Sequence, residues 1–466
     1  MTGSDVGSVH AALRELRDAD LPVRGGTTWA YVYDSGSDSA HEVAARAYAE
    51  MLDVNALDPT AFPSVVALEN SVVGTAASLL GGEAGIFTSG GTESCLLAVK
   101  AARDARPDVD RPQVVLPVTA HPAFHKGAAY LGLEVVTTPV DPVSFRADAG
   151  AVAGAVTDRT VLVVASAPSY PTGTVDPVPE IAAAAAARGV LCHVDACIGG
   201  WVLPFLPDAP PFDLSVPGVT SLSVDLHKYA YAPKGASVLL FRDRALRRHA
   251  YFAYAGWPGY PVINPTVQSA KSAGPVAAAW AVLRHVGLDG YRALAGQARE
   301  ALLALARGVA GMDGLRVLGV PDSTLLAVAG SDVDAFVVAD ELRARGHYAQ
   351  VQLALGAVPR NLHFSAHGVS MSTVDALVAA LAESVAAARA LGPVVVPPSA
   401  LAAVTAADLS TLDEDGFGAL LATSGLTFTD GAGRPSFAAV NALLETLTPA
   451  DREAVLRLFV SVLFTP

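Results

Sequence analysis

Residues 221–237 read SLSVDLHKYAYAPKGAS and contain Lys228, the residue around which the chain is organised. A β-branched run over 219–224 leads directly into the tetrapeptide DLHK, so a strand delivers a His-Lys pair at its carboxyl end. Open α/β sheets bind their ligands beyond the carboxyl ends of the strands. We therefore expect a chemically active amine at this place in the fold.

Two further segments supply the groups that such an amine needs. Residues 191–196 read LCHVDA, a second buried-strand pattern that ends in the carboxylate of Asp195, and residues 87–94 read FTSGGTES, a glycine turn that opens a helix. The backbone N–H groups of the turn can bind a phosphate, the carboxylate can keep a pyridine nitrogen protonated, and the amine can hold an aldehyde as an imine. Together they are the parts that pyridoxal 5'-phosphate requires.

Composition limits the class of protein. With 466 residues, 52% hydrophobic and 16% charged, the chain can form two or three compact domains. A formal charge of −14 without a basic tract argues against nucleic acid or an anionic membrane surface as a main partner. A small-molecule amine or amino acid is the favoured partner.

The cysteines and the apolar segments bear on location. Cys95, Cys192 and Cys197 cannot form a disulfide framework, which favours a reducing cytoplasm, and their spacing predicts no metal site. The N-terminus lacks the pattern of a signal peptide. Mean hydropathy is +0.40, yet the apolar stretches are interrupted well short of the roughly 20 residues that a spanning helix requires, so we expect no integral membrane segment.

The order of predicted elements indicates an α/β fold. Between residues 62 and 307, β-branched runs at 113–116, 134–138, 160–165, 190–194, 221–224 and 237–241 alternate with helical stretches. This alternation predicts a mostly parallel sheet with helices on both faces. We expect four units: an N-terminal segment with an aromatic active-site loop (1–61), a large domain (62–307), a small α/β domain (308–391) and a C-terminal extension of two or three helices (392–466).

The three motifs also carry a resemblance to a known family. TSGGTES at 88–94, HVDACIGG at 193–200 and DLHKYAYAPKGAS at 225–237, in this order and spacing, resemble the sphingosine-1-phosphate lyases within the group II pyridoxal-phosphate decarboxylases. The likeness extends from about residue 33 to about residue 248 and is weaker beyond. It implies fold type I, with a large cofactor-binding domain, a smaller C-terminal domain, and a homodimer whose active site takes residues from both subunits.

The resemblance implies roles for individual residues. Lys228 is similar to the Schiff-base lysine, Asp195 to the partner of the pyridine nitrogen, and His121 to the histidine that stacks on the ring. The further cofactor contacts that it implies are Gly90, Gly91, Thr92, His227 and Asn55, and the residues that it associates with substrate handling or proton transfer are Tyr33, Tyr170 and Lys234.

Simpler structural interpretations remain for several of these residues. His121 precedes a proline and could only shape a turn, and the two tyrosines could be packing residues. His193 could be a hydrogen-bonded core histidine, and Glu93 could cap the helix that it opens, so neither receives a catalytic role.

The sequence departs from the lyases at the end of the site that binds the substrate phosphate. Asp58 stands where the lyases have a histidine, and Tyr260 and Val262 stand where they have a glycine and a tyrosine. In the segment that the dimer partner would contribute, 264–271, Lys271 replaces an arginine and lacks its bidentate fork.

Three hypotheses about function follow. The first is a lyase that makes a retro-aldol cut in a β-hydroxy amine, phosphorylated or not, to give an aldehyde and a smaller amine. The second is an L-amino-acid decarboxylase, which the altered residues neither favour nor exclude. The third, a cofactor-binding protein that has lost catalysis, is disfavoured because Lys228, Asp195 and the GGT turn are all present.

Overall fold

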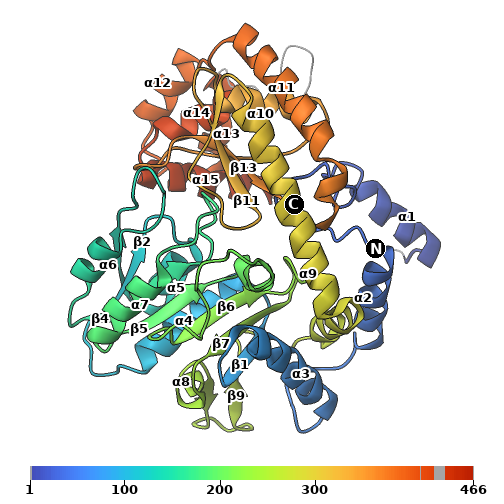
Figure 1. Cartoon of the computed structure of the whole chain (residues 1–466), viewed down its shortest axis with the longest axis vertical. Helices are drawn as coiled ribbons and strands as arrows, with labels where there is room; N and C mark the ends of the chain where they lie inside the picture. The colour runs from blue at the N-terminus through green and yellow to red at the C-terminus, as the bar shows by residue number, and fades with distance from the viewer. Residues whose placement is uncertain (1–2, 410, 425–435, 465–466) are drawn as a thin grey trace.

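The computed structural model describes residues 3–409, 411–424 and 436–464 of the chain. Figure 1 shows a lower part built on a seven-stranded sheet and an upper part built on a four-stranded sheet. The long helix α9 (Gly274–Ala310), yellow in the figure, runs between them. It bends at Gly287, which has φ 65° and ψ 168°.

The large sheet has the strand order β1-β7-β6-β5-β4-β2-β3. All neighbouring pairs are parallel except those that β7 makes with β1 and β6. Its strands are β1 (Ala84–Thr88), β2 (Gln113–Pro117), β3 (Glu134–Thr138), β4 (Thr160–Ser166), β5 (Leu191–Asp195), β6 (Ser221–Asp225) and β7 (Ser237–Phe241). The predicted mostly parallel sheet is confirmed, but β1 was missed because its sequence, AGIFT, is short and contains a glycine.

Helices cover both faces of this sheet, and they are α3 (Pro63–Leu80), α4 (Gly91–Asp104), α5 (Ala123–Leu131), α6 (Ala149–Ala155), α7 (Val178–Ala187) and α8 (Arg244–Arg248). The helix α2 (Asp38–Glu50) packs against α9 instead. β4 has the sequence TVLVVAS, and all seven of its residues are buried, as expected for a strand covered on both faces. Two short turns of 3₁₀-helix follow β5, at Gly199–Trp201 and Leu203–Phe205.

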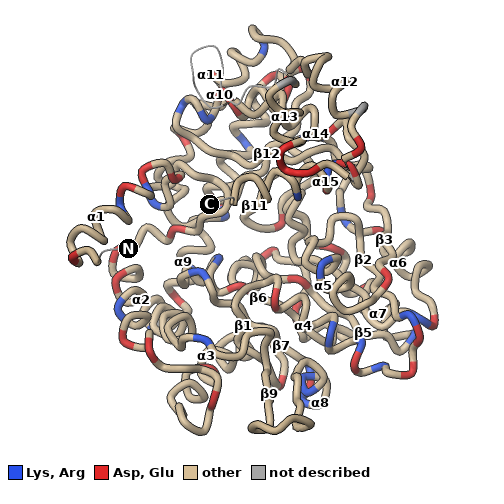
Figure 2. Tube along the Cα trace, turned by 180° about the vertical axis from the view of Figure 1, so that it is seen from behind, with Lys and Arg blue, Asp and Glu red and all other residues tan. Residues whose placement is uncertain are grey.

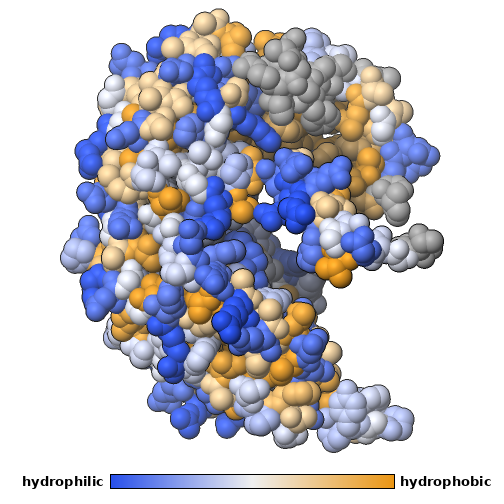
Figure 3. All heavy atoms as spheres, turned by 90° about the vertical axis from the view of Figure 1, so that its right-hand side faces the viewer, coloured by the Kyte–Doolittle hydropathy of each residue, from blue (hydrophilic) through white to orange (hydrophobic). Residues whose placement is uncertain are grey.

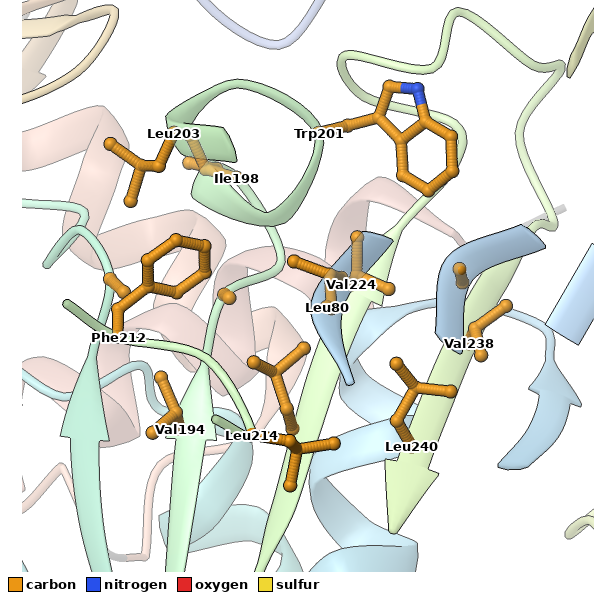
Figure 4. Packing of buried hydrophobic residues seen from close by; sticks show 14 of the residues in the cluster. Leu80, Val194, Ile198, Trp201, Leu203, Phe212, Leu214, Val224, Val238 and Leu240 are labelled. Carbon is orange, nitrogen blue, oxygen red and sulfur yellow. The ribbon is translucent and has the colours of Figure 1, made fainter. Parts of the chain in front are cut away.

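The main hydrophobic core lies between the sheet and the helices on one face. Figure 4 shows Trp201, Leu203 and Phe212 packed against strand side chains such as Val194 and Val224. Trp201 is 1% exposed. At roughly 25 cal/mol per Å² of buried apolar area, each such side chain contributes about 1.5–3 kcal/mol, so this core fixes the strands whose ends carry the site.

The small sheet has the order β10-β11-β13-β12, and all its pairs are antiparallel. The strands are β10 (Leu315–Val317), β11 (Leu325–Gly330), β12 (Gln350–Gln352) and β13 (Asn361–Ser365), and the helices beside them are α10 (Ala335–Ala344) and α11 (Val374–Leu391). The combination of a sheet with helices agrees with the small α/β domain expected for this region. The N-terminal helix α1 (Val6–Leu16) has no buried residue.

The C-terminal extension contains four helices among its described residues: α12 (Pro398–Ala406), α13 (Glu414–Ser424), α14 (Ala438–Thr446) and α15 (Pro449–Leu463). The prediction of two or three helices was therefore too low. The extension also packs on the small sheet's unit, since the Asp340 carboxylate of α10 accepts the backbone N–H groups of Phe437 and Ala438 at the start of α14. This part-buried contact of a carboxylate with N–H groups both caps α14 and fixes its position.

The molecular surface carries mixed charges and apolar patches. Figure 2 shows Asp and Glu distributed over both parts of the molecule, in keeping with the net charge of −14. The face in Figure 3 is hollowed between the upper and lower parts. Among the described residues, no helix combines the length and the apolar character needed to cross a bilayer.

Candidate active site

Strand ends and one helix start meet at a single cavity of about 370 Å³. β4, β5 and β6 are parallel neighbours, so Ser166, Asp195 and Asp225 at their carboxyl ends lie along the same edge of the sheet. The first turn of α4 approaches from β1. The cavity is lined by Ser89, Gly90, Gly91, Thr92, Glu93, Cys95, His121, Ser166, Pro168, Tyr170, Asp195, Cys197, Ile198, Asp225, His227 and Lys228. The three sequence motifs are thus brought together as predicted from their chemistry.

Lys228 forms a close ion pair inside this cavity. Its Nζ lies 2.9 Å from Oδ2 of Asp225, whose side chain is 3% exposed. Burial alone would lower the pKa of Lys228, but the acidic groups around it, Asp225 first among them, together outweigh burial and raise that pKa well above its usual value. In turn, burial would raise the pKa of Asp225, but the positive charge of Lys228 and the hydrogen bond from His227 lower it far below its usual value.

Asp225 was missed as a functional residue by the sequence reasoning. The signal was present, because a carboxylate three residues before a lysine at a strand end lies on the same turn as that lysine. The second oxygen of Asp225, Oδ1, is buried and has no hydrogen-bond partner among the described residues. An unpaired buried carboxylate oxygen beside a cavity indicates a group to be bound there.

Asp195 lies at the end of β5 and is oriented by its neighbours. Its Oδ1 accepts the backbone N–H of Cys197 at 3.1 Å and lies 3.5 Å from the hydroxyl of Ser223. Ser223 also lies 3.2 Å from Nε2 of His193. His193 is fully buried, and burial lowers its pKa to about 4, so it is the hydrogen-bonded core histidine of the simpler interpretation.

The glycine turn before α4 can receive an anion. Backbone N–H groups at a helix N-terminus bind phosphate, and Gly91 allows the chain to approach closely here. A Cβ atom on Gly91 would lie 2.7 Å from Sγ of Cys197 and 2.8 Å from Oδ2 of Asp225, closer than real Cβ contacts occur. Glu93 does not act as a simple cap, because it accepts the N–H groups of Ser89 and Val267 and joins two segments.

His121 and Tyr170 lie on the walls of the cavity. The Nδ1 atom of His121 accepts the backbone N–H of Ala123, and burial lowers the pKa of the imidazole. The hydroxyl of Tyr170 donates to Oε1 of Gln350 at 2.5 Å, and its ring stacks on His363 with centroids 4.2 Å apart. Tyr170 thus links the cavity to the small sheet, a contact that no sequence pattern indicated.

Tyr33 and Lys234 line a neighbouring cavity of about 410 Å³ that shares His227 with the first. Nζ of Lys234 lies 4.8 Å from the centre of the Tyr33 ring. Burial and the positive charge of Lys228 lower the pKa of Lys234. The remaining lining is largely carbon-rich, including Val23, Tyr31, Val32, Ala40, Ala44, Ala232 and Pro233.

Other sequence-predicted positions do not line either cavity in this chain. The side chain of Asn55 accepts the N–H of Leu57, and the exposed Asp58 accepts the N–H and hydroxyl of Thr60, so both stabilise turns. Lys271 donates to the hydroxyl of Thr266, and burial lowers its pKa. The roles predicted for Asn55 and Lys271 remain predictions.

The hairpin of β8 (Phe252–Tyr254) and β9 (Val262–Asn264) precedes the segment predicted to reach a partner subunit. It exposes large apolar side chains: Tyr260 is 61% exposed and Ile263 59%. Val262, the other residue at which the chain departs from the lyases, pairs with Tyr254 in this hairpin.

Comparison with known proteins identifies the family. Residues 27–311 match the family described as "Pyridoxal-dependent decarboxylase conserved domain". A sphingosine-1-phosphate lyase of Arabidopsis thaliana is 35% identical over 376 residues, which are 77% of this chain and 68% of the relative. This chain belongs to the pyridoxal-dependent decarboxylase family, among the sphingosine-1-phosphate lyases.

Further similarities agree with this membership. The sphingosine-1-phosphate lyase of Dictyostelium discoideum is 41% identical over 300 residues, covering 63% of this chain and 56% of that protein. The chain therefore spans a little more than half of that relative. The structure of a Burkholderia pseudomallei sphingosine-1-phosphate lyase superposes with a TM-score of 0.79 at 35% identity, covering 84% of this chain and 92% of the other. Fold type I is thereby confirmed.

Two comparisons point outside the lyases. A probable L-tyrosine/L-aspartate decarboxylase of Methanothrix thermoacetophila is 36% identical over 286 residues, 60% of this chain and 71% of that protein. Residues 398–462 match a family model for a C-terminal helix-turn-helix domain of pyridoxal-dependent enzymes. Residues 398–466 contain eight Asp and Glu against three Arg, a charge balance opposite to that of a surface that binds the DNA backbone.

The family's cofactor, pyridoxal phosphate, fits the residues present. Lys228 offers an amine for the aldehyde, Asp195 a carboxylate for the pyridine nitrogen, and the turn at Gly90–Gly91 a cradle for the phosphate. The unpaired oxygen of Asp225 is expected where a polar ligand fills the cavity.

Proposed function

We propose that this protein is a carbon–carbon lyase that makes a retro-aldol cut in a long-chain β-hydroxy amine, phosphorylated or not. The products are an aldehyde and a smaller amine. The observation that carries the proposal is the presence, beside a cofactor cavity built on Lys228, Asp195 and the GGT turn, of a second and mainly apolar cavity that shares His227 with it as a lining residue. A polar head in the first cavity and an aliphatic chain in the second is the arrangement that such a substrate needs.

We assign roles to the residues around the substrate from their charges and positions. When bound, pyridoxal phosphate supplies an electron acceptor conjugated to the amine-bearing carbon. Asp195 would hold the proton on the pyridine nitrogen, His121 would lie against the ring, and Thr92 and His227 with the glycine turn would hold the phosphate. Lys228 would anchor the aldehyde, and its amine would be available for proton transfer once the substrate is bound.

The proton on the substrate hydroxyl must be removed for the aldehyde to leave. Burial raises the pKa of Tyr170, so its hydroxyl stays protonated and donates a hydrogen bond. Burial and Lys228 lower the pKa of Lys234, which makes its amine a better proton acceptor than an ordinary lysine. We therefore propose Lys234 as the base and Tyr170 as a donor, with Tyr33 positioning Lys234 through its ring.

An L-amino-acid decarboxylase is the second candidate, and the similarity to the probable L-tyrosine/L-aspartate decarboxylase favours it. The two reactions differ only in the bond that is broken on the amine-bearing carbon. In a decarboxylase, the substrate carboxylate takes the position that the hydroxyl-bearing carbon takes in a lyase.

The test is to incubate the cofactor-loaded protein with sphinganine 1-phosphate and to analyse the products by mass spectrometry. A long-chain aldehyde and phosphoethanolamine, absent with Lys228→Ala, would support the lyase. Release of CO₂ from an L-amino acid, with no aldehyde from sphinganine 1-phosphate, would support the decarboxylase instead. Lys100→Ala is the matched control for loss of a lysine, because Lys100 forms an ion pair with Asp104 on α4 and does not line the cavity.

We also propose that the chain divides into units at residues 61, 307 and 391. We further propose a cytoplasmic homodimer in which segment 264–271 of each subunit completes the site of the other. The exposed apolar side chains of the β8–β9 hairpin support an interface at that segment. Light scattering after gel filtration tests it: Tyr260→Glu should convert a particle of twice the chain mass into one of 47.6 kDa. A parent protein that is already monomeric would refute the dimer.

A further inference from the structure

Three metal-ligand groups lie together in the wall of the cofactor cavity. Cys95 on α4 and Asp195 and Cys197 at the end of β5 bring two sulfur atoms and a carboxylate oxygen within 4.8 Å of one another. Both cysteines are buried, at 1% and 6% exposure, and both line the cavity. The spacing of the cysteines predicted no metal site because the two come from distant segments, which only the fold brings together.

The chemistry of this group suits a thiophilic divalent cation. Two thiolates and a carboxylate are ligands of Zn²⁺, and soft sulfur ligands also select its heavier relative Cd²⁺. A tetrahedral ion with Zn–S bonds of about 2.3 Å holds two sulfurs about 3.8 Å apart, so small side-chain rotations would close the present spacing. All three residues line the cavity, so water from the cavity can supply a fourth ligand.

The local charge does not oppose a cation. The ammonium group of Lys228 lies in the same cavity, but its partner Asp225 neutralises it at 2.9 Å. Asp195 therefore adds a negative charge beside the two sulfur atoms, and this charge attracts a cation to the group.

We propose that Cys95, Asp195 and Cys197 bind one Zn²⁺-like cation in the cofactor-free protein, and that this cation and pyridoxal phosphate exclude each other. The cation displaces one proton from each thiol to solvent and takes one oxygen of Asp195. Because that carboxylate is also the proposed partner of the pyridine nitrogen, it cannot serve both. The exclusion rests on the proposed role of Asp195, whereas the metal binding does not.

The test uses the full-length protein stripped of cofactor, with its fold checked by circular dichroism. Cd²⁺ is titrated, and the sulfur-to-cadmium charge-transfer absorbance in the near ultraviolet is followed. We expect one Cd²⁺ per chain in the parent and binding weakened by more than about a hundredfold in Cys95→Val, since loss of even an outer-shell partner costs 10–100-fold. Cys192→Ala is the matched control, because Cys192 is buried but lines no part of the cavity.

The same titration is repeated on the loaded protein. We expect saturation with pyridoxal phosphate to abolish the charge-transfer band, and excess Zn²⁺ to slow cofactor loading in the parent but not in Cys95→Val. An unchanged band in Cys95→Val would overturn the metal site. An equal Cd²⁺ affinity with and without cofactor would overturn the exclusion and leave the lyase proposal untouched, because neither readout depends on turnover.

Discussion

Replacing Asp225 by asparagine tests the electrostatic design of the site, because this carboxylate is the close partner of Lys228. The two charges lie 2.9 Å apart, and the side chains are 3% and 19% exposed. At an effective dielectric constant of about 20, their attraction is roughly 6 kcal/mol. Lys228 is partly exposed, so water screens part of this attraction. If only a quarter of the energy remains, its loss still raises the fraction of Lys228 present as the free amine about tenfold.

The expected result of Asp225→Asn is therefore a more reactive Lys228. Cofactor-stripped protein is labelled with an amine-acylating reagent at neutral pH, and the peptide that carries Lys228 is quantified by mass spectrometry. We expect labelling at least about ten times faster than in the parent, and free energy of unfolding lower by about 3 kcal/mol, the usual loss when one member of a buried ion pair is removed. Asp58→Asn, on an exposed turn, is the control.

The sign of the pH dependence is set by the same pair. The pKa of Asp225 is lowered by folding, so its stabilising effect is present above its unfolded pKa and is lost as the pH falls through the folded one. The raised pKa of Lys228 has the complementary effect at high pH, where stability is lost as the lysine deprotonates. Unchanged labelling in Asp225→Asn, or labelling slower than in the parent, would refute the reasoning.

Three further predictions follow from the geometry. Gly91→Ala should weaken cofactor binding at least tenfold, as followed by absorbance, because its Cβ would lie 2.7 Å from Sγ of Cys197, whereas Gly74→Ala, which meets no atom within 4 Å, should not. Tyr170→Phe should lower kcat by about a hundredfold with cofactor affinity unchanged, and an unchanged kcat would remove Tyr170 from the mechanism. Burial lowers the pKa of His363 to about 3, so protonation of this residue should cost the parent about 2 kcal/mol of stability between pH 6.5 and 4.5 in denaturant titrations, and His363→Gln should lose less.

The sequence predicted the large sheet and the meeting point of the three motifs because both depend on local patterns. β-branched runs such as that of β4 are buried on both faces, and a carboxylate or lysine just after such a run must lie at the sheet edge. The same logic could have identified Asp225. The strand β1 escaped because its apolar pattern is short and contains a glycine.

Contacts between distant segments could not be read from the sequence. Tyr170 bonds to Gln350, and Cys95 approaches Cys197, only because the large sheet, α4 and the small sheet pack around one cavity. Asn55 shows the converse, since a residue placed by family resemblance stabilises a local turn in this chain.

The most direct test of the central claim is the ratio of kcat/KM for sphinganine 1-phosphate to that for L-tyrosine and L-aspartate, measured on one preparation of cofactor-loaded protein. The lyase account predicts a ratio of at least about a hundred, with an aldehyde as product and with turnover abolished in Lys228→Ala. A ratio below one, with CO₂ released from an amino acid, would contradict it.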